Sequence, residues 1–142
     1  MIRRAKIRDV AELVACIDAA YDVARESGID LPPVSEGLDQ DIRDHLVWIS
    51  VEESQTVGVI VVAINSDHAH LMNIAVHPSA GGKGIAKSLI ECALEELRRL
   101  KVGRIELATH VDMPRNVSLY RHLGWAETGR SGNKVHMSRA II

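Results

Sequence analysis

The 142-residue sequence contains no phenylalanine, and aromatic residues of all kinds make up only 3% of the chain. Proteins that bind single-stranded nucleic acid stack the bases on aromatic side chains, and this chain has too few of them to build such a platform. Its net charge of -2 also provides no attraction to nucleic acid or to an anionic membrane surface. We therefore expect neither nucleic acid nor a membrane among its partners.

Cysteines and long apolar runs are scarce as well. The two cysteines, Cys16 and Cys92, fall on the apolar side of helical patterns, which predicts small buried side chains in a reducing compartment and no disulfide. The apolar run VIVVAI at 59–64 is far too short to span a membrane, and the N-terminal MIRRAKIRD lacks the apolar stretch of a signal peptide. These features predict a cytoplasmic protein.

The remaining composition is that of a globular protein, with 46% hydrophobic and 25% charged residues. A chain of this length buries about two thirds of its unfolded surface, so we expect one domain over 1–142. Apolar periodicity predicts strands over 2–7, 46–51, 57–64, 68–76, 103–110 and 134–141. It predicts helices from a cap at Asp9 to Gly28, over 39–44, from 85 to about 100, and from Pro114 to Gly124. The strand, helix, strand order over 68–110 predicts a right-handed parallel crossover.

One stretch within that crossover, VHPSAGGKGIAKSLI at 76–90, points to a ligand. Pro78 has no N–H group and ends the strand, and the glycines that follow allow the backbone to approach a bulky group closely. A helix begins at once, with an apolar stripe of Ile85, Leu89, Cys92, Ala93 and Leu100. The N–H groups at the start of a helix and the positive end of its dipole bind anions, so we expect a phosphate here.

Two common phosphate loops do not fit this stretch. A P-loop requires glycine five residues before Gly-Lys-Ser/Thr, but His77 occupies the first position and Gly84 the last. A dinucleotide fingerprint requires a third glycine where Lys87 stands.

The diphosphate loop of the GNAT family of N-acetyltransferases does fit. Its pattern is Gln or Arg, two residues, Gly, one residue, then Gly or Ala, behind a strand that ends in Val-x-Pro. The matching residues here are Gly81, Gly82, Lys83, Gly84, Ile85 and Ala86. A second family block, Asn-x-x-x-Tyr, a basic residue, then Gly-Trp, is matched by Asn116, Tyr120, Arg121, Gly124 and Trp125. The two blocks in series make the sequence similar to a small GNAT acetyltransferase.

The resemblance implies an α/β (α+β) fold with helices on both faces of a mixed, mostly antiparallel sheet of six to seven strands, including one parallel crossover. It also implies acetyl-CoA as cosubstrate and acetyl transfer to a primary amine by direct attack in a ternary complex. The backbone amides of 82–87, with Lys83 and Lys87, are implied to bind the pyrophosphate.

Further roles are implied along the next strand and in the second block. The main chain of Ile74, Ala75 and Val76 is implied to pair with the pantetheine arm, with the Val76 amide as oxyanion donor. Tyr120 is implied to protonate the leaving thiolate, and Asn116 to hold the pantetheine or a nearby carbonyl.

The general base is open. Relatives often carry Glu directly before the strand's Asn, where this chain has Met72. His70 lies on the same strand face as Met72 and has a pKa range suited to a base, so it is the first candidate. His110 is the second candidate, and Glu52 and Glu53 are further alternatives. His68 and His70 could also hold a metal, but no further ligands stand at suitable spacing, so we expect none.

Gly81 stands where the family usually has Gln or Arg, so we expect weaker cofactor binding. Together with Met72 it leaves a second hypothesis, a sensor that binds acyl-CoA with little transferase activity. The loop 28–38, with Asp30, Glu36 and Asp39 near it, is implied to line the acceptor side, for a small-molecule or peptide amine. Relatives are often dimers, so a homodimer is a further expectation.

Overall fold

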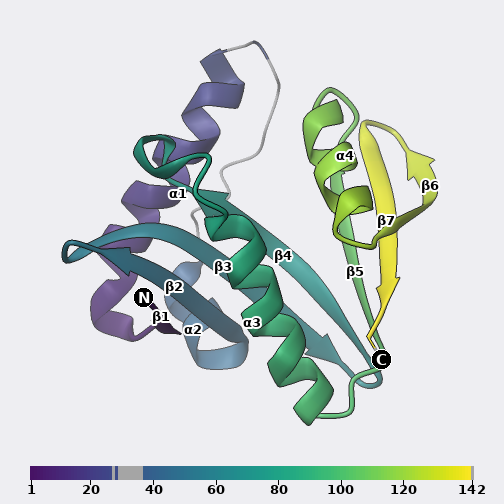
Figure 1. The fold of residues 1–142 in the computed structure, drawn as a ribbon, viewed down its shortest axis with the longest axis horizontal. Helices are drawn as coiled ribbons and strands as arrows, with labels where there is room; N and C mark the ends of the chain where they lie inside the picture. The colour runs from purple at the N-terminus through teal and green to yellow at the C-terminus, as the bar shows by residue number, and fades with distance from the viewer. Residues whose placement is uncertain (27, 29–36, 142) are drawn as a thin grey trace. The chain divides into compact units, whose positions relative to one another are not determined.

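The computed structural model describes residues 1–26, 28 and 37–141. Its helices are α1 (Val10–Glu26), α2 (Leu38–Asp44), α3 (Ile85–Arg99) and α4 (Pro114–His122) (Figure 1). Its strands are β1 (Ile2–Arg4), β2 (Leu46–Glu52), β3 (Gln55–Asn65), β4 (His68–Val76), β5 (Arg104–His110), β6 (Ala126–Ser131) and β7 (Lys134–Ala140). In this part of the chain no helix is long and apolar enough to cross a membrane.

Among the described residues the seven strands are hydrogen-bonded in the order β1-β2-β3-β4-β5-β7-β6. The β1–β2, β2–β3, β5–β7 and β6–β7 pairs are antiparallel, and β4–β5 is parallel. The mixed, mostly antiparallel sheet with one parallel crossover is thus confirmed. The chain forms two compact units, one of Met1–Ala63 with Met72–Ala93 and one of Ile64–Leu71 with Leu94–Ile142.

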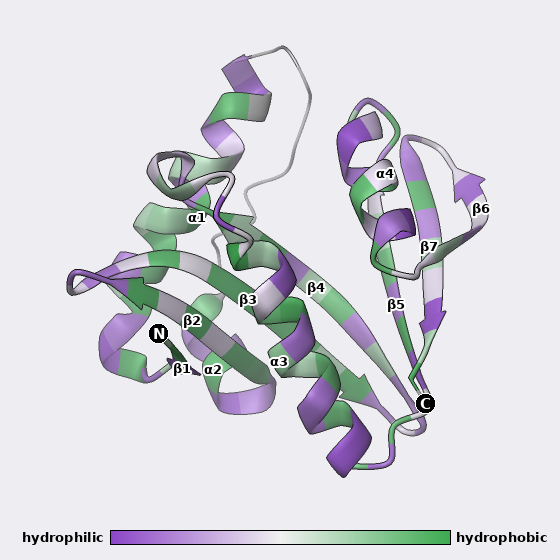
Figure 2. Cartoon of the chain, viewed as in Figure 1, coloured by the Kyte–Doolittle hydropathy of each residue, from purple (hydrophilic) through white to green (hydrophobic). Residues whose placement is uncertain are grey.

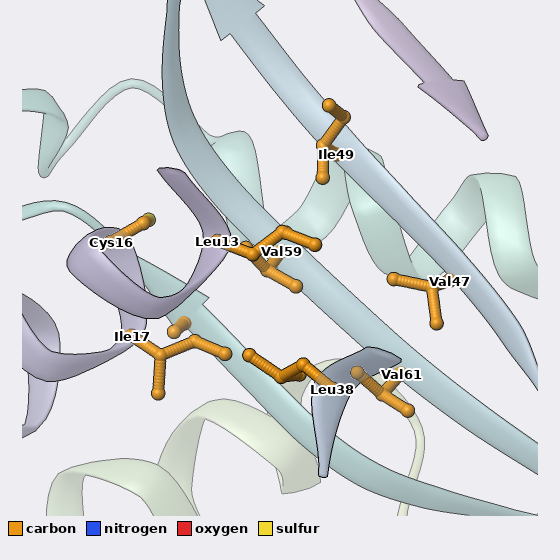
Figure 3. Close-up of a cluster of buried hydrophobic side chains, with 9 residues drawn as sticks. Leu13, Cys16, Ile17, Leu38, Val47, Ile49, Val59 and Val61 are labelled. Carbon is orange, nitrogen blue, oxygen red and sulfur yellow. The ribbon is translucent and has the colours of Figure 1, made fainter. Parts of the chain in front are cut away.

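The first unit has its main core between α1, α2 and one face of β2 and β3 (Figure 3). Side chains alternate between the two faces of a strand, so Val47 and Ile49 of β2 and Val59 and Val61 of β3 point to these helices. The core residues are Leu13, Cys16, Ile17, Leu38, Val47, Ile49, Val59, Val61 and Ala75. Burial raises the pKa of the Cys16 thiol to about 11, so this cysteine stays protonated.

The other face of β3 packs against α3, and its closest approach is at Gly58. A Cβ atom at this position would lie 2.7 Å from Cγ2 of Ile85 and 3.0 Å from Cδ1 of Leu89. Such distances are far inside van der Waals contact, so a residue larger than glycine fits here only if these side chains or the helix move. Figure 2 shows the hydrophobic colouring of β3, which has helices on both faces, and the hydrophilic last turn of α3.

The second unit is a smaller layer of β5, β7 and β6 with α4. Its buried residues include Ile105, Leu107, Val117, Tyr120, Trp125, Val135 and Met137. They again alternate along β5 and β7, as the sequence pattern predicts. The sequence pattern does not predict β6, because AETGRS has no apolar alternation. In the structure β6 is an edge strand and pairs with β7.

Three predicted features differ in the structure. The first strand ends at Arg4, because Asp9 accepts hydrogen bonds from the Lys6 amide at 2.7 Å and from Arg3 at 2.9 Å, which folds 7–9 into a short turn. Asp9 thus binds the residues before it and does not cap α1. The Arg3 guanidinium lowers the pKa of the Asp9 carboxyl to about 2. Leu100 lies beyond the end of α3 and is 42% exposed, so it does not belong to the apolar stripe.

Candidate functional site

The glycine-rich loop begins where β4 ends, and its first residues are fixed by hydrogen bonds. The His77 amide donates to the Val57 carbonyl at 2.8 Å, which joins the end of β4 to β3. The His77 ring nitrogen Nδ1 accepts from the Ser79 amide at 3.1 Å and lies 2.8 Å from its hydroxyl oxygen. Pro78–Ala80 then forms one turn of 3-10 helix. This capping places the three glycines directly before α3.

Two of these glycines are required by backbone conformation and one is not. Gly82 has a φ of 79° and Gly84 a φ of 74°, a region that residues with a Cβ rarely adopt. Gly81 has a φ of -65°, and a Cβ there would have its nearest neighbour at 3.7 Å. The Gln or Arg that the family usually has at position 81 would therefore fit here. The backbone conformation does not require glycine at this position.

The start of α3 directs N–H groups toward this loop. The first helical hydrogen bond runs from the Ser88 amide to the Gly84 carbonyl at 3.0 Å, so the amides of 85–87 precede it. Lys83 and Lys87 are both exposed and add positive charge. Lys83 contacts the Glu52 carboxylate at 3.3 Å, and Lys87 that of Glu91 at 4.0 Å. The loop can bind a diphosphate through backbone amides and two mobile cations.

The last residues of β4 lie beside this loop in the same unit. Parallel pairing with β5 joins His68, Ala69 and His70 to Arg104, Ile105 and Glu106. Ala75 is buried, and Ile74 and Val76 are half-buried. The main chain there offers polar groups to an extended ligand arm.

The sequence analysis missed a buried polar contact of Asn73, which lies on the face of β4 opposite to Ile74 and Val76. Asn73 is 8% exposed, and its Oδ1 accepts from the Tyr21 hydroxyl of α1 at 2.9 Å. Burial raises the pKa of Tyr21, so its hydroxyl keeps the proton that it donates. An asparagine on the buried face of an alternating strand indicates that its side chain has a hydrogen-bond partner, but the sequence does not identify that partner.

The second unit contains the first base candidate, His70. Its pKa is lowered, chiefly by loss of hydration and also by His68, His136 and Lys134, while Glu106 opposes the shift. A neutral imidazole at pH 7 is the form that accepts a proton.

His110, the second candidate, is bound differently. Its Nδ1 accepts from the Asp112 amide at 3.0 Å, so a neutral ring carries its proton on Nε2. Nε2 lies 3.3 Å from the side-chain nitrogen of Asn133, an amide whose oxygen and nitrogen are interchangeable by a flip. Neither ring nitrogen then has a lone pair for a substrate proton, which disfavours His110 as the base.

Asn116 and Tyr120 both lie on α4 in the second unit. The Asn116 amide nitrogen donates to Thr109 Oγ1 at 3.5 Å, which ties the first turn of α4 to β5. Tyr120 is 6% exposed and packs edge-on against Trp125 with ring centroids 5.7 Å apart. The backbone amide of Trp125 donates a hydrogen bond to the backbone carbonyl of Tyr120 at 2.9 Å, which fixes the position of Trp125.

The predicted site residues therefore fall into two groups. Residues of the loop and of the end of β4 lie together in the first unit, and His70, Asn116 and Tyr120 belong to the second. Asp30 and Glu36, predicted on the acceptor side, lie outside the described residues. In the part of the chain that the structure describes, no three His, Cys, Asp or Glu side chains are grouped to hold a metal.

Known proteins that are similar to this chain are acetyltransferases. The model of the acetyltransferase (GNAT) family matches residues 15–125. The uncharacterized N-acetyltransferase YjgM of Escherichia coli is 27% identical over an alignment of 158 residues, which covers 99% of this chain and 95% of YjgM.

Two solved structures are similar over nearly the whole chain. The PaiA N-acetyltransferase from Thermoplasma acidophilum, in complex with coenzyme A, matches with a TM-score of 0.91 at 20% identity, over 99% of this chain and 98% of that one. The ribosomal-protein-alanine N-acetyltransferase from Brucella melitensis matches with a TM-score of 0.76 at 23% identity, over 99% of both chains.

Proposed function

Because the chain belongs to the acetyltransferase (GNAT) family, we propose that it moves the acetyl group of acetyl-CoA to a primary amine by direct attack in a ternary complex. The family and the fold that the sequence resembles are confirmed, and with them an N-acetyltransferase. The coenzyme A donor belongs to the proposal and is supported by the similarity to the PaiA structure in complex with coenzyme A. The acetyl group, the direct mechanism and the amine class are the proposed part.

The observation that carries the proposal is the loop before α3. Gly82 and Gly84 adopt left-handed conformations, and the amides of 85–87 precede the first helical hydrogen bond. A diphosphate fits such a site, because it can contact several amides without meeting a side chain. We assign the coenzyme A diphosphate to this loop and the pantetheine arm to the main chain of Ile74, Ala75 and Val76.

The chemistry follows from the roles that the family resemblance implies. The ammonium form of the substrate loses one proton to His70, and the neutral nitrogen attacks the thioester carbonyl, whose developing negative charge is stabilised by the Val76 amide. The carbonyl re-forms as the C–S bond breaks, the second proton on nitrogen passes to solvent, and the thiolate takes a proton from the Tyr120 hydroxyl. Solvent then reprotonates Tyr120 and removes the proton from His70. Asn116 holds the pantetheine arm in position for the attack.

The base assignment predicts a change in the pH profile. Because the pKa of His70 is lowered, the parent's kcat/KM should fall only at pH values below the ordinary histidine pKa of about 6.5. His70→Gln should lower kcat/KM by about tenfold or more and remove this acidic limb. His68→Gln, two residues earlier on the same strand face, is the matched control and should keep the limb. An unchanged limb in His70→Gln would exclude this base.

The conformation at position 81 predicts a gain in binding. Gly81→Arg should tighten binding of coenzyme A by about threefold to tenfold, because the φ of -65° accepts any residue and a guanidinium adds a charged hydrogen-bond donor. Isothermal titration measures the affinity, with Gly81→Ala as the control for the loss of glycine alone. An affinity no higher than that of Gly81→Ala would show that this position does not face the diphosphate.

The proposed function is tested by binding and by turnover together. Thermal unfolding with acetyl-CoA, coenzyme A, ATP or NAD should show a shift of several degrees for the first two ligands only. Release of free thiol is then followed with a panel of small amines and peptides. Absence of any shift with both coenzyme A ligands would overturn the proposal.

Gly81 and Met72 favour one alternative, a sensor that binds acyl-CoA with little transfer. Binding without thiol release from any amine would support it. The similarity to the Brucella melitensis enzyme, at 23% identity, extends to the fold and leaves the acceptor open between a small-molecule and a peptide amine. The homodimer and the cytoplasmic location stay predictions.

A further inference from the structure

We infer that Glu52 competes with the coenzyme A diphosphate for Lys83 and so sets the affinity of the loop for its ligand. The Lys83 ammonium lies 3.3 Å from the Glu52 carboxylate, although the two residues are 31 positions apart. Both side chains are partly exposed, at 57% and 39% respectively, so the pair can open at little cost. This inference rests on the proposed function.

The β2–β3 hairpin brings Glu52 to the loop. Glu52 pairs with Gln55, and the turn between them consists of Glu53 and Ser54, which have φ values of 50° and 64°. Such a two-residue turn with both residues left-handed is tight and well defined. Glu52 is therefore the last residue of β2, held at a fixed end of the hairpin.

The loop is fixed to the same part of β3 from two sides. The His77 amide donates to the Val57 carbonyl at 2.8 Å, at the start of the loop. At its end, Ile85 packs against β3 so closely that a Cβ at Gly58 would lie 2.7 Å from its Cγ2. Lys83, between these two anchors, thus stays within reach of Glu52.

The consequence for the ligand follows from charge. Lys83 is the only lysine or arginine between 77 and 84, since the family's charged or polar residue at 81 is glycine here. An arriving diphosphate must draw Lys83 away from Glu52, and it then faces the released carboxylate. Both effects weaken binding, so the net attraction of the loop for phosphate is smaller than its lysine suggests.

The test measures coenzyme A affinity by isothermal titration in the full chain. Glu52→Gln should bind coenzyme A about twofold to fivefold more tightly than the parent, because exposed ion pairs have effects of this size. Glu53→Gln makes the same change in net charge one residue along the turn and should shift the affinity by less than half as much. Equal effects of the two variants would overturn the inference in favour of general charge.

A double variant separates competition for Lys83 from simple repulsion. In a Lys83→Ala background, the gain from Glu52→Gln should shrink markedly, since the competing pair no longer exists. A gain of undiminished size would overturn the competition. Equal affinity of the parent and Glu52→Gln would overturn the inference alone, whereas a parent that binds no coenzyme A would overturn the proposed function and the inference with it.

Discussion

Tyr120→Phe is expected to lower kcat by about a hundredfold or more while leaving the Kd for acetyl-CoA nearly unchanged. The proposed role of the Tyr120 hydroxyl is to give a proton to the departing thiolate, and loss of a general acid typically costs two orders of magnitude or more. The phenyl ring remains, so its packing against Trp125 at a centroid distance of 5.7 Å is retained. Steady-state kinetics with thiol detection and titration of acetyl-CoA measure the two quantities.

The chain's other tyrosine provides the matched control. Tyr21→Phe also removes one buried hydroxyl, the one that donates to Asn73 at 2.9 Å. We expect it to lower the free energy of unfolding by about 1 kcal/mol and kcat by far less than Tyr120→Phe. Equal losses of kcat in the two variants would mean that Tyr120 acts through stability and not as the acid.

Gly58→Val is expected to lower the free energy of unfolding by about 2 to 3 kcal/mol and to weaken binding of coenzyme A. The first atom of any side chain at 58 would lie 2.7 Å from Ile85 and 3.0 Å from Leu89. Overpacking of this kind typically costs 1–3 kcal/mol, which for this chain length corresponds to a melting temperature about 10 °C lower. Because Ile85 begins α3, the same displacement should move the loop that precedes it.

Compensation by a second change tests this reason. Ile85→Ala removes the methyl group that meets the new side chain, so the double variant Gly58→Val/Ile85→Ala should be more stable than the sum of the two single losses predicts. Thermal unfolding of the four proteins measures the difference. Strict additivity would show that the valine is accommodated elsewhere and that α3 does not depend on Gly58.

Local patterns predicted most of the fold, because the features concerned are encoded within a few residues. The alternation along 57–64, the proline at 78 and the glycines after it were enough to find β3, the end of β4 and the start of α3. The exclusion of the P-loop and of the dinucleotide fingerprint used spacing alone. The two family blocks then identified the family.

Features that depend on distant partners were not predictable in this way. Asn73 meets a tyrosine 52 positions earlier, and Lys83 meets a carboxylate 31 positions earlier. Neither pairing follows from the periodicity of either segment, because it depends on how α1 and the β2–β3 hairpin fold against β4 and its loop. The environment of the proposed base, His70, was not predictable either, since its pKa is lowered chiefly by burial and also by His136 and Lys134, which are distant in the sequence.

The backbone conformation at the three glycines separates the positions that the loop structure restricts from the position that can change cofactor affinity. Positions 82 and 84, with φ values of 79° and 74°, favour glycine, so most substitutions there strain the backbone. Position 81 has a φ of -65°, and a Cβ there would have its nearest neighbour at 3.7 Å, so this position accepts side chains and can vary more. Descendants of this chain, or a saturation library at this single codon, can therefore sample a range of cofactor affinities while the rest of the protein stays the same.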